Sequence, residues 1–291
     1  MPSDSDHQLV RLANGAFSVR SLAYGETMHP GIGPAAEAEA LYVNQLWLRA
    51  RRAASTGEFV VWDVGLGAAA NATAVLRATR EIPGRLRLVS FENTTTPLAF
   101  ALQHLAELPS LASYEAPLRT LLTSGQTRFH DGQQTIEWTL TVADFPAWLA
   151  AGAAPGAGLP PAPHALLFDP FSPAKNPAMW TLDVFTHLFR RLDPQRPCAL
   201  ATYSRSTMTR VALLLAGFWV GAGEATGTKE ETTIAANAVN LLARPLDGRW
   251  LERARRSDSA EPLREAVYRR ASLSEATWER LREHPQFRAL H

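Results

Sequence analysis

Short apolar runs alternate with amphipathic stretches along the middle of the chain. Runs of this kind are typical of strands buried on both faces of a sheet, and they fall at 59–64, 86–92, 135–142, 164–170 and 198–203. Segments with helical spacing separate them, at 70–81, 98–108, 145–151, 179–192 and 205–217. Strands that alternate with helices predict right-handed crossovers and a mostly parallel, doubly wound sheet, and therefore an α/β fold.

The end of this series departs from the alternation. Two further strand-like runs, 218–223 and 231–237, follow each other with a loop between them and no helix. Neighbouring strands joined in this way pair antiparallel. A parallel sheet with an antiparallel edge is typical of Rossmann-like S-adenosylmethionine methyltransferases and not of nucleotide dehydrogenases.

Three segments outside this series carry other patterns: the N-terminus, an internal segment and the C-terminus. Two β-prone runs flank Asn14-Gly15, which predicts a hairpin, and a helix is expected over 35–53. The Gly- and Pro-rich segment 152–163 predicts a loop. The chain is charged and helical from Arg244 on, and Ser272 and Glu275 have the spacing of a helix capping box.

These boundaries divide the chain into three parts. Residues 1–54 would form a hairpin, a loop and a helix packed on the core, 55–243 the Rossmann-like domain, and 244–291 a C-terminal helical extension.

Composition narrows the class of protein. The 291 residues are 46% hydrophobic with a net charge of +1, so bulk charge does not indicate a nucleic-acid binder, although a local basic face could exist. No apolar run reaches the ~18 residues of a membrane span, and we expect a cytoplasmic protein. The one cysteine, Cys198, cannot form an internal disulfide. The eight histidines show no metal-ligand spacing, so no metal is expected.

The first predicted strand ends in a turn rich in glycine. Gly65 and Gly67 allow the backbone to approach a ligand closely at the carboxyl end of the sheet. Gly65-x-Gly67-x-x-Ala70 also fits a dinucleotide fingerprint, and a tight turn without a ligand remains a third interpretation. Asp63 favours the methyltransferase, because a carboxylate there would repel a pyrophosphate but would bind the ammonium of a methionine moiety.

Two more carboxylates follow the next strands. Glu92 ends the second strand and could accept hydrogen bonds from both hydroxyls of a ribose, as it would in either cofactor class. Asp144 follows the third strand. Its carboxylate could accept a hydrogen bond from an adenine amino group, cap the helix that follows, or do both.

Asp169 lies at the carboxyl end of the fourth strand and opens the segment Asp169-Pro170-Phe171-Ser172-Pro173. It therefore faces the same crevice as the glycine turn, and the two prolines stiffen the loop behind it. A nitrogen that accepts a methyl group must lose a proton, and a carboxylate stabilises the cation that forms. An acid-proline-aromatic sequence in this position resembles that of enzymes that methylate an exocyclic or aliphatic nitrogen, and a loop that Asp169 merely caps is the alternative.

At this point the chain resembles a known family. The stretch 169–181 is similar to the Asp-x-Phe-x-Pro-x-Lys-x-Pro-x-x-Trp signature of the tRNA 5-methylaminomethyl-2-thiouridine methyltransferases, the MnmC-like methyltransferase domain. Further similar segments follow in family order between about residues 15 and 240: 24–29, 63–71, 89–92, 201–204, 216–218 and 227–230.

This resemblance implies a function and a set of site residues. The enzyme would transfer a methyl group from S-adenosylmethionine to the amine of 5-aminomethyl-2-thiouridine at a tRNA wobble position, with Asp169 nearest the nitrogen. The cofactor-binding residues would be Asp63, Gly65, Gly67, Asn71, Glu92 and Asp144. The substrate-binding residues would be Glu26, Pro170, Phe171, Lys175 and Tyr203. Some members carry a second, FAD-dependent domain, and we expect this chain to be the methyltransferase alone.

Two departures from the family pattern keep other functions open. Ala69 replaces the third glycine of the turn, and the segment around Lys229-Glu230 is less basic than is typical. The alternatives are a methyltransferase of the same fold that acts on another amine, a non-catalytic relative that binds RNA or protein, and a dinucleotide oxidoreductase.

Overall fold

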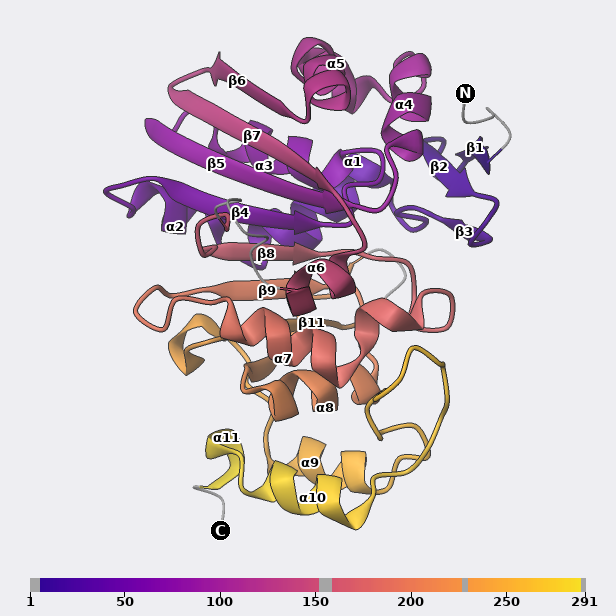
Figure 1. Cartoon of the computed structure of the whole chain (residues 1–291), viewed down its shortest axis with the longest axis vertical. Helices are drawn as coiled ribbons and strands as arrows, with labels where there is room; N and C mark the ends of the chain where they lie inside the picture. The colour runs from indigo at the N-terminus through magenta and orange to yellow at the C-terminus, as the bar shows by residue number, and fades with distance from the viewer. Residues whose placement is uncertain (1–5, 152–158, 227–229, 289–291) are drawn as a thin grey trace.

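A computed structural model describes residues 6–151, 159–226 and 230–288. Its centre is an eight-stranded sheet (Figure 1). In spatial order the strands are β10 (Trp219–Gly223), β11 (Thr232–Ala236), β9 (Ala199–Thr202), β8 (Ala165–Phe168), β4 (Phe59–Val64), β5 (Gly84–Glu92), β7 (Gln134–Val142) and β6 (Gln126–Asp131). The five strands from β9 to β7 are mutually parallel. The expected α/β fold with a mostly parallel sheet is confirmed.

Both edges of the sheet are antiparallel. The edge predicted from the sequence is present, because β11 lies between β9 and β10 and runs antiparallel to both. The other edge was missed: the turn at Asp131-Gly132 joins β7 to the antiparallel strand β6. Phe129 is the only large apolar residue in β6, so the strand is held through its backbone and gives no strong sequence pattern.

Helices cover both faces of the sheet. One face carries α1 (Pro34–Ala38), the π-helix η2 (Glu39–Asn44), α2 (Leu48–Ala53), α3 (Ala70–Thr79), α4 (Thr96–Gln103), η3 (Pro109–Tyr114) and α5 (Glu115–Ser124). The other carries α6 (Phe145–Ala151), η4 (Pro177–Trp180), α7 (Leu182–Arg190), α8 (Thr207–Ala216), α9 (Gly248–Arg255), α10 (Glu275–Arg282) and α11 (Pro285–Arg288). A further 3-10 turn is η5 (Val239–Leu241). The helix expected over 98–108 ends at Gln103, and α5 was not predicted.

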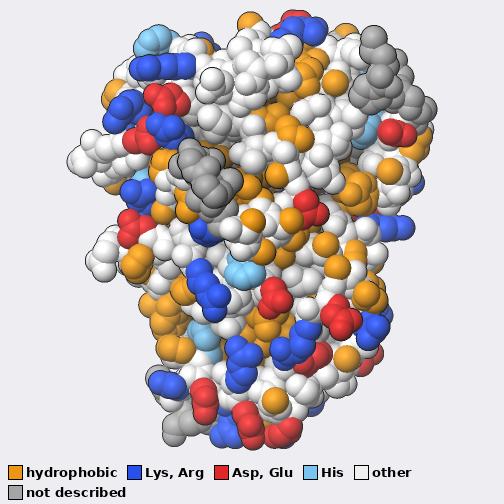
Figure 2. Space-filling model, in the orientation of Figure 1, with side chains coloured by type: hydrophobic (Ala, Val, Ile, Leu, Met, Phe, Trp, Pro, Cys, Tyr) orange, Lys and Arg blue, Asp and Glu red, His pale blue; other side chains and the backbone are white. Residues whose placement is uncertain are grey.

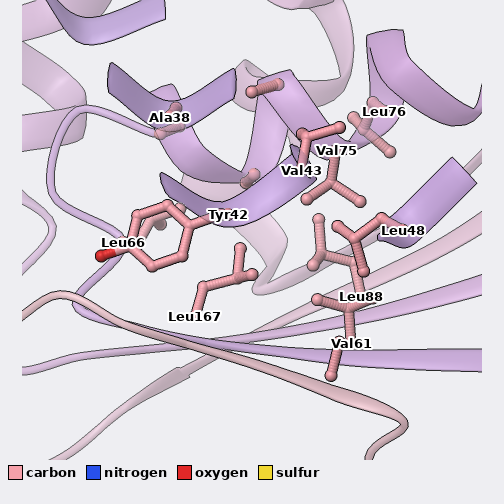
Figure 3. Packing of buried hydrophobic residues seen from close by; sticks show 14 of the residues in the cluster. Ala38, Tyr42, Val43, Leu48, Val61, Leu66, Val75, Leu76, Leu88 and Leu167 are labelled. Atoms are coloured by element: carbon pink, nitrogen blue, oxygen red, sulfur yellow. The ribbon is translucent and has the colours of Figure 1, made fainter. Parts of the chain in front are cut away.

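The apolar residues that define these layers interlock across the helix–sheet boundary. Figure 3 shows Tyr42, Val43 and Val75 on helices that pack above Val61 and Leu88 of the strands. These side chains are no more than 1% exposed. The sheet is therefore buried on this face, as the mostly apolar strand runs predict.

The prediction of a single helix over 35–53 is wrong. The segment forms α1, a π-helical turn and α2, and Trp47 lies between the last two in the left-handed conformation with φ 49°. Leu46 and Leu48 are both buried, although a straight helix would place them about 200° apart around its axis. The break turns both into the core and leaves Trp47 47% exposed.

The N-terminal hairpin is confirmed and gains a third strand. Strand β1 (His7–Arg11) pairs antiparallel with β2 (Phe17–Ser21), and Gly15 turns between them with φ 85°. The short β3 (Glu26–Thr27) pairs with β2. In Figure 1 this small sheet lies beside the ends of β4 and β5 to which their arrows point. It therefore brings the segment after β3 to the carboxyl edge of the main sheet.

The C-terminal extension is helical only in part. Residues 256–274 form no helix, and they join the core through a hydrogen bond from the Leu182 N–H to the Leu263 carbonyl, 2.8 Å long. The cap of α10 is Ser274 and not Ser272, because the Ser274 side chain accepts from the Thr277 N–H. Glu261 accepts from the Ser274 N–H at 2.9 Å, the role that the capping-box glutamate was expected to play.

Two other expectations can be placed. Residues 159–163 have no regular structure, whereas the rest of the loop expected at 152–163 lies outside the described residues. Among the described residues no helix is long and apolar enough to cross a bilayer. The division into parts at 54 and 243 remains a prediction.

Candidate functional site

A cavity of about 340 Å³ lies at the carboxyl ends of β4, β5 and β8. One side is formed by the glycine turn and the end of β5, another by the Asp169 segment. The third side is formed by the segment after β3. This is the position where open α/β sheets bind their ligands. The residues that line it are Tyr24, Glu26–Pro30, Glu37, Leu41, Val64–Ala68, Phe91–Asn93, Ala143, Phe145, Asp169–Ser172, Asn176, Met179 and Tyr203.

The glycine turn is built from backbone contacts. The N–H groups of Gly65 and Leu66 both donate to the Phe91 carbonyl, at 3.0 and 3.2 Å. Gly65 has φ 93°, and a Cβ there would lie 2.8 Å from the Asp169 carbonyl oxygen. Only glycine fits this position, so the turn and the Asp169 segment can approach each other directly.

Ala69 keeps the glycine-like shape of the turn. Its φ is 62° and its ψ 21°, in the left-handed region, and the residue is fully buried at the start of α3. For a residue with a side chain, the left-handed conformation is less stable than the right-handed one by ~1–2 kcal/mol, a cost that glycine does not have. The departure from the family pattern therefore adds backbone strain and a buried methyl group without unfolding the turn.

Asp63 lies beneath the turn and does not line the cavity. Its carboxylate is fully buried, and one oxygen accepts from Ser90 Oγ at 2.9 Å. Ser90 Oγ in turn accepts from Trp138 Nε1 at 3.0 Å. The other oxygen, Oδ1, has no hydrogen-bond partner among the described residues. Burial raises the pKa of Asp63 to about 7, and nearby Asp169 and Glu92 act in the same direction.

Glu92 lines the cavity next to the glycine turn. Its Oε2 accepts from the Gly67 N–H and its Oε1 from the Asn93 N–H, both at 2.8 Å. Burial raises the pKa of this carboxyl, and the backbone N–H donors partly oppose the shift. The carboxylate is therefore fixed at the cavity wall, where its remaining lone pairs could accept from a ligand diol.

Asp144 caps the helix that follows it. Its Oδ1 accepts from the Ala147 N–H at 2.8 Å, at the start of α6. Its neighbours Ala143 and Phe145 line the cavity, whereas its own side chain does not. The capping role is thus confirmed, and the adenine contact remains a prediction.

Asp169 is joined to the helix of the glycine turn. Its N–H donates to the Val64 carbonyl at 2.9 Å, which continues the strand pairing of β8 with β4. Its Oδ2 accepts from Asn71 Nδ2 at 2.7 Å, and Asn71 Oδ1 is buried without a hydrogen-bond partner in the described chain. Both residues come from the expected set, and the fold brings them together across 98 positions of sequence.

The segment behind Asp169 is held from both sides. Glu26 accepts from the Ser172 N–H at 3.0 Å and from the Ser172 hydroxyl. The Tyr203 hydroxyl donates to the Pro170 carbonyl at 2.8 Å. Phe171 stacks on Tyr24, with ring centroids 4.2 Å apart and planes 20° apart. Of the five expected substrate-binding residues, Glu26, Pro170, Phe171 and Tyr203 line the cavity.

Lys175 is the exception. Its side chain is exposed and does not line the cavity. The residue's backbone N–H donates to the Ser172 carbonyl at 2.8 Å, so it belongs to the same stiff segment. Its assignment to the substrate remains a prediction, and any contact would be made outside the cavity.

Sequence reasoning missed His29 and Glu37. His29 has φ 49°; its Nε2 lies 3.6 Å from Asp169 Oδ2 and its Nδ1 3.7 Å from Glu37 Oε2. The Oε1 of Glu37 accepts from the N–H groups of Gly31 and Ile32. His29 lies in a loop and Glu37 in the short helix α1, so no periodic pattern links them, and only the tertiary structure shows that His29 lies between Glu37 and Asp169.

The cavity is acidic. Its lining contains four carboxylates and, among the described residues, no lysine or arginine. On the face shown in Figure 2, by comparison, basic and acidic side chains are intermingled. Such a site favours cationic groups and disfavours a pyrophosphate.

The described residues contain no group of three or more His, Cys, Asp or Glu side chains that could hold a metal ion.

These features fit S-adenosylmethionine, which carries an ammonium, a sulfonium and a ribose diol. Asp63 Oδ1, which has no hydrogen-bond partner in the described part of the chain, lies beneath the glycine turn and could accept from an ammonium only if that group entered the turn. At Gly67 a Cβ would lie 3.1 Å from Met28 Sδ, so the turn and the segment above it leave little room for side chains. Glu92 presents a fixed carboxylate for the diol.

Comparisons with known proteins agree with this geometry. A family model described as S-adenosyl-L-methionine-dependent methyltransferase matches residues 117–238. The chain is 28% identical over 228 residues to the tRNA 5-methylaminomethyl-2-thiouridine biosynthesis bifunctional protein MnmC of Aeromonas hydrophila, covering 75% of this chain and 34% of that protein. It is 30% identical over 256 residues to the MnmC of Azoarcus sp., covering 85% and 36%. The chain thus spans about a third of the length of these relatives.

A solved structure shares the fold. The crystal structure of MnmC2 from Aquifex aeolicus superposes with a TM-score of 0.67 at 21% identity, covering 91% of this chain and 80% of that chain. The family-model match, the shared fold and the acidic cavity all support the class of S-adenosylmethionine-dependent methyltransferases. The chain is related, more particularly, to the methyltransferase region of the MnmC proteins.

Proposed function

We propose that the protein methylates the amine of 5-aminomethyl-2-thiouridine at the wobble position of tRNA, in the cytoplasm. The relatives named above are tRNA 5-methylaminomethyl-2-thiouridine biosynthesis proteins. The observation that carries the proposal is the position of Asp169, which lines an acidic cavity and is hydrogen-bonded to Asn71 beside the cofactor turn. A carboxylate in that position suits a primary amine, because the amine is cationic at neutral pH.

The residues divide into two sets around the cavity. Asp63, Gly65, Gly67, Asn71 and Glu92 would hold the cofactor, with Asp144 supporting the adenine side from its helix cap. Bound S-adenosylmethionine supplies an electrophilic methyl group on a sulfonium. Asp169 would then hold the acceptor nitrogen in line with that methyl group and stabilise the positive charge that the nitrogen gains.

The charge of the cavity also indicates how a polynucleotide would bind. Four carboxylates line the site, so the phosphates of a tRNA must stay outside while a base carrying an amine enters. Phe171 and Tyr203 would form an aromatic wall against the entering base, with Pro170 as an apolar neighbour. Exposed Lys175 would contact the nucleic acid at the rim.

Nucleoside analysis tests this proposal. The purified protein is incubated with S-adenosylmethionine and tRNA that carries the unmethylated aminomethyl group, and the digest is examined by mass spectrometry. We expect a gain of one methyl on the aminomethyl nucleoside and none in an Asp169→Asn variant. Methylation of small amines with no product on tRNA would favour a different amine acceptor, and S-adenosylhomocysteine binding without any methyl transfer would favour a non-catalytic relative.

A further inference from the structure

His29 is placed to react with whatever occupies the Asp169 side of the cavity. The residue lines that cavity, and each ring nitrogen faces a carboxylate, Asp169 at 3.6 Å and Glu37 at 3.7 Å. Its backbone has the left-handed φ of 49°, which few residues other than glycine adopt, although histidine does so more often than most. Strain of this kind persists only where surrounding contacts hold the residue in place, and it occurs often at active sites.

From this arrangement we infer that His29 takes the proton that the acceptor amine loses, while Asp169 orients the nitrogen. The inference rests on the proposed function. An aliphatic ammonium has no lone pair with which to attack a methyl group, so it must first be deprotonated. A histidine side chain is a stronger base than an aspartate by roughly 2.6 pH units in their unperturbed states. The imidazolium formed at His29 would lie between two carboxylates, which stabilise its charge.

The other groups near His29 are less suited to accept this proton. Burial and the charge of Asp169 raise the pKa of both Tyr42 and Tyr203 well above the usual range, so both phenols stay protonated. Both oxygens of Glu26 accept from Ser172, and those of Glu92 accept from backbone N–H groups. Asp63 lies beneath the turn and does not line the cavity.

The proposed reaction is a proton transfer followed by a methyl transfer. The ammonium gives one proton to His29, and the nitrogen lone pair that is freed forms the new N–C bond. The electron pair of the broken S–C bond stays on sulfur, so the products are a secondary ammonium and a thioether. His29 then returns its proton to water.

Single-turnover rates across pH test this role. At pH 7 the His29→Asn variant should be slower than wild type by ~100-fold, the lower range for loss of a positioned proton acceptor. Asparagine tolerates a positive φ, so the fold should be retained. The deficit should shrink as the pH approaches ~10, where an aliphatic amine loses its proton unaided. The exposed His130 of β6 gives the matched control: His130→Asn should behave as wild type.

A second measurement does not depend on catalysis. Glu37→Gln keeps the oxygen that accepts from Gly31 and Ile32 but removes the charge that faces His29. In a proton NMR titration of the ligand-free protein, the His29 ring resonance, identified by its loss in His29→Asn, should then titrate lower by ~1 pH unit. His130 should not shift.

The outcomes separate the two proposals. An active wild type with a His29→Asn variant of equal rate at every pH would overturn the role of His29 and leave the proposed function standing. A His29 resonance that ignores the loss of the Glu37 charge would also overturn it. A wild type that transfers no methyl group to any amine would remove the proposed function itself, whatever the titration shows.

Discussion

The two sides of the cavity are built in different ways. The side proposed to hold the cofactor, called the cofactor side below, is a continuous turn in which main-chain N–H groups converge on the Phe91 carbonyl and on Glu92. The Asp169 side is assembled from side chains of separate segments, with Glu26, His29 and Tyr203 all meeting residues 169–172. One side depends on backbone shape and the other on tertiary contacts, so substitutions should affect them differently.

The largest effect is expected on the side-chain side. Asp169→Ala should lower turnover by ~100-fold or more, because it removes the group that we propose orients the nitrogen and stabilises its charge. S-adenosylhomocysteine affinity should change little, since the backbone turn is untouched. Single-turnover rates on aminomethyl-bearing tRNA and calorimetric titration measure the two quantities. A rate near that of wild type would rule out Asp169 as the centre of the reaction.

Substitutions beside the backbone turn should instead act mainly on cofactor affinity. Asp63→Ala and Glu92→Ala should each weaken S-adenosylhomocysteine binding by roughly tenfold or more, the loss of one charge-assisted hydrogen bond of ~1.5–3 kcal/mol. Circular dichroism should show a retained fold. Unchanged affinity in both variants would contradict the assignment of this turn as the cofactor site.

The buried Asp63 also predicts a pH dependence on the cofactor side. Its pKa in the folded protein is about 7, so the carboxyl is largely protonated at pH 6 and ionised at pH 8. Binding of an ammonium group requires the ionised form, so S-adenosylhomocysteine affinity should rise between pH 6 and 8. Asp63→Asn should abolish that rise, and a slope that survives the substitution would assign it to another group.

The raised pKa of Asp63 also makes the stability of the ligand-free protein depend on pH, in the direction opposite to that of cofactor affinity. Folding raises the pKa of Asp63, so the folded state binds more protons than the unfolded state between the two pKa values. The contribution of Asp63 to stability is thus fully present below the unfolded pKa and is lost as the pH rises through about 7. Thermal melts of wild type and Asp63→Asn, compared across this window, would show whether the two effects come from one carboxyl.

The contrast between the two sides explains what could be predicted from the sequence. The apolar strand runs predict the mostly parallel sheet with its antiparallel edge, and the contiguous turn from Asp63 to Asn71 predicts one wall of the cavity. His29 lies in a loop and Glu37 in the short helix α1, and the approach of His29 to Asp169 is a long-range contact. Strand β6 was missed for a different reason, because an edge strand held by local backbone pairing has no apolar pattern.

Predictions of helix boundaries from local sequence patterns failed where tertiary contacts decided the boundary. Ser272 and Glu275 have capping-box spacing, but Glu261 accepts from the Ser274 N–H and moves the cap by two residues. Likewise, the apolar positions between 35 and 53 fit one helix in outline, yet the core requires Leu46 and Leu48 to turn inward together. In both cases tertiary contacts outweighed a weak helical preference.

The smallest effect is expected at Ala69, and it tests whether the cofactor side depends on backbone shape alone. Glycine would relieve a left-handed alanine that is strained by ~1–2 kcal/mol, but it would give the unfolded chain more freedom, by ~0.5–1 kcal/mol, and remove a buried methyl group worth ~0.8 kcal/mol. These terms nearly cancel, so the melting temperature of Ala69→Gly should stay within about 3 °C of wild type. S-adenosylhomocysteine affinity should be equal or higher, because φ 62° is native to glycine and the turn keeps its hydrogen bonds to Phe91. Calorimetric titration and single-turnover rates measure the result. A well-folded Ala69→Gly variant with clearly reduced turnover would mean that the methyl group itself shapes the site, and it would favour an acceptor other than aminomethyl-bearing tRNA.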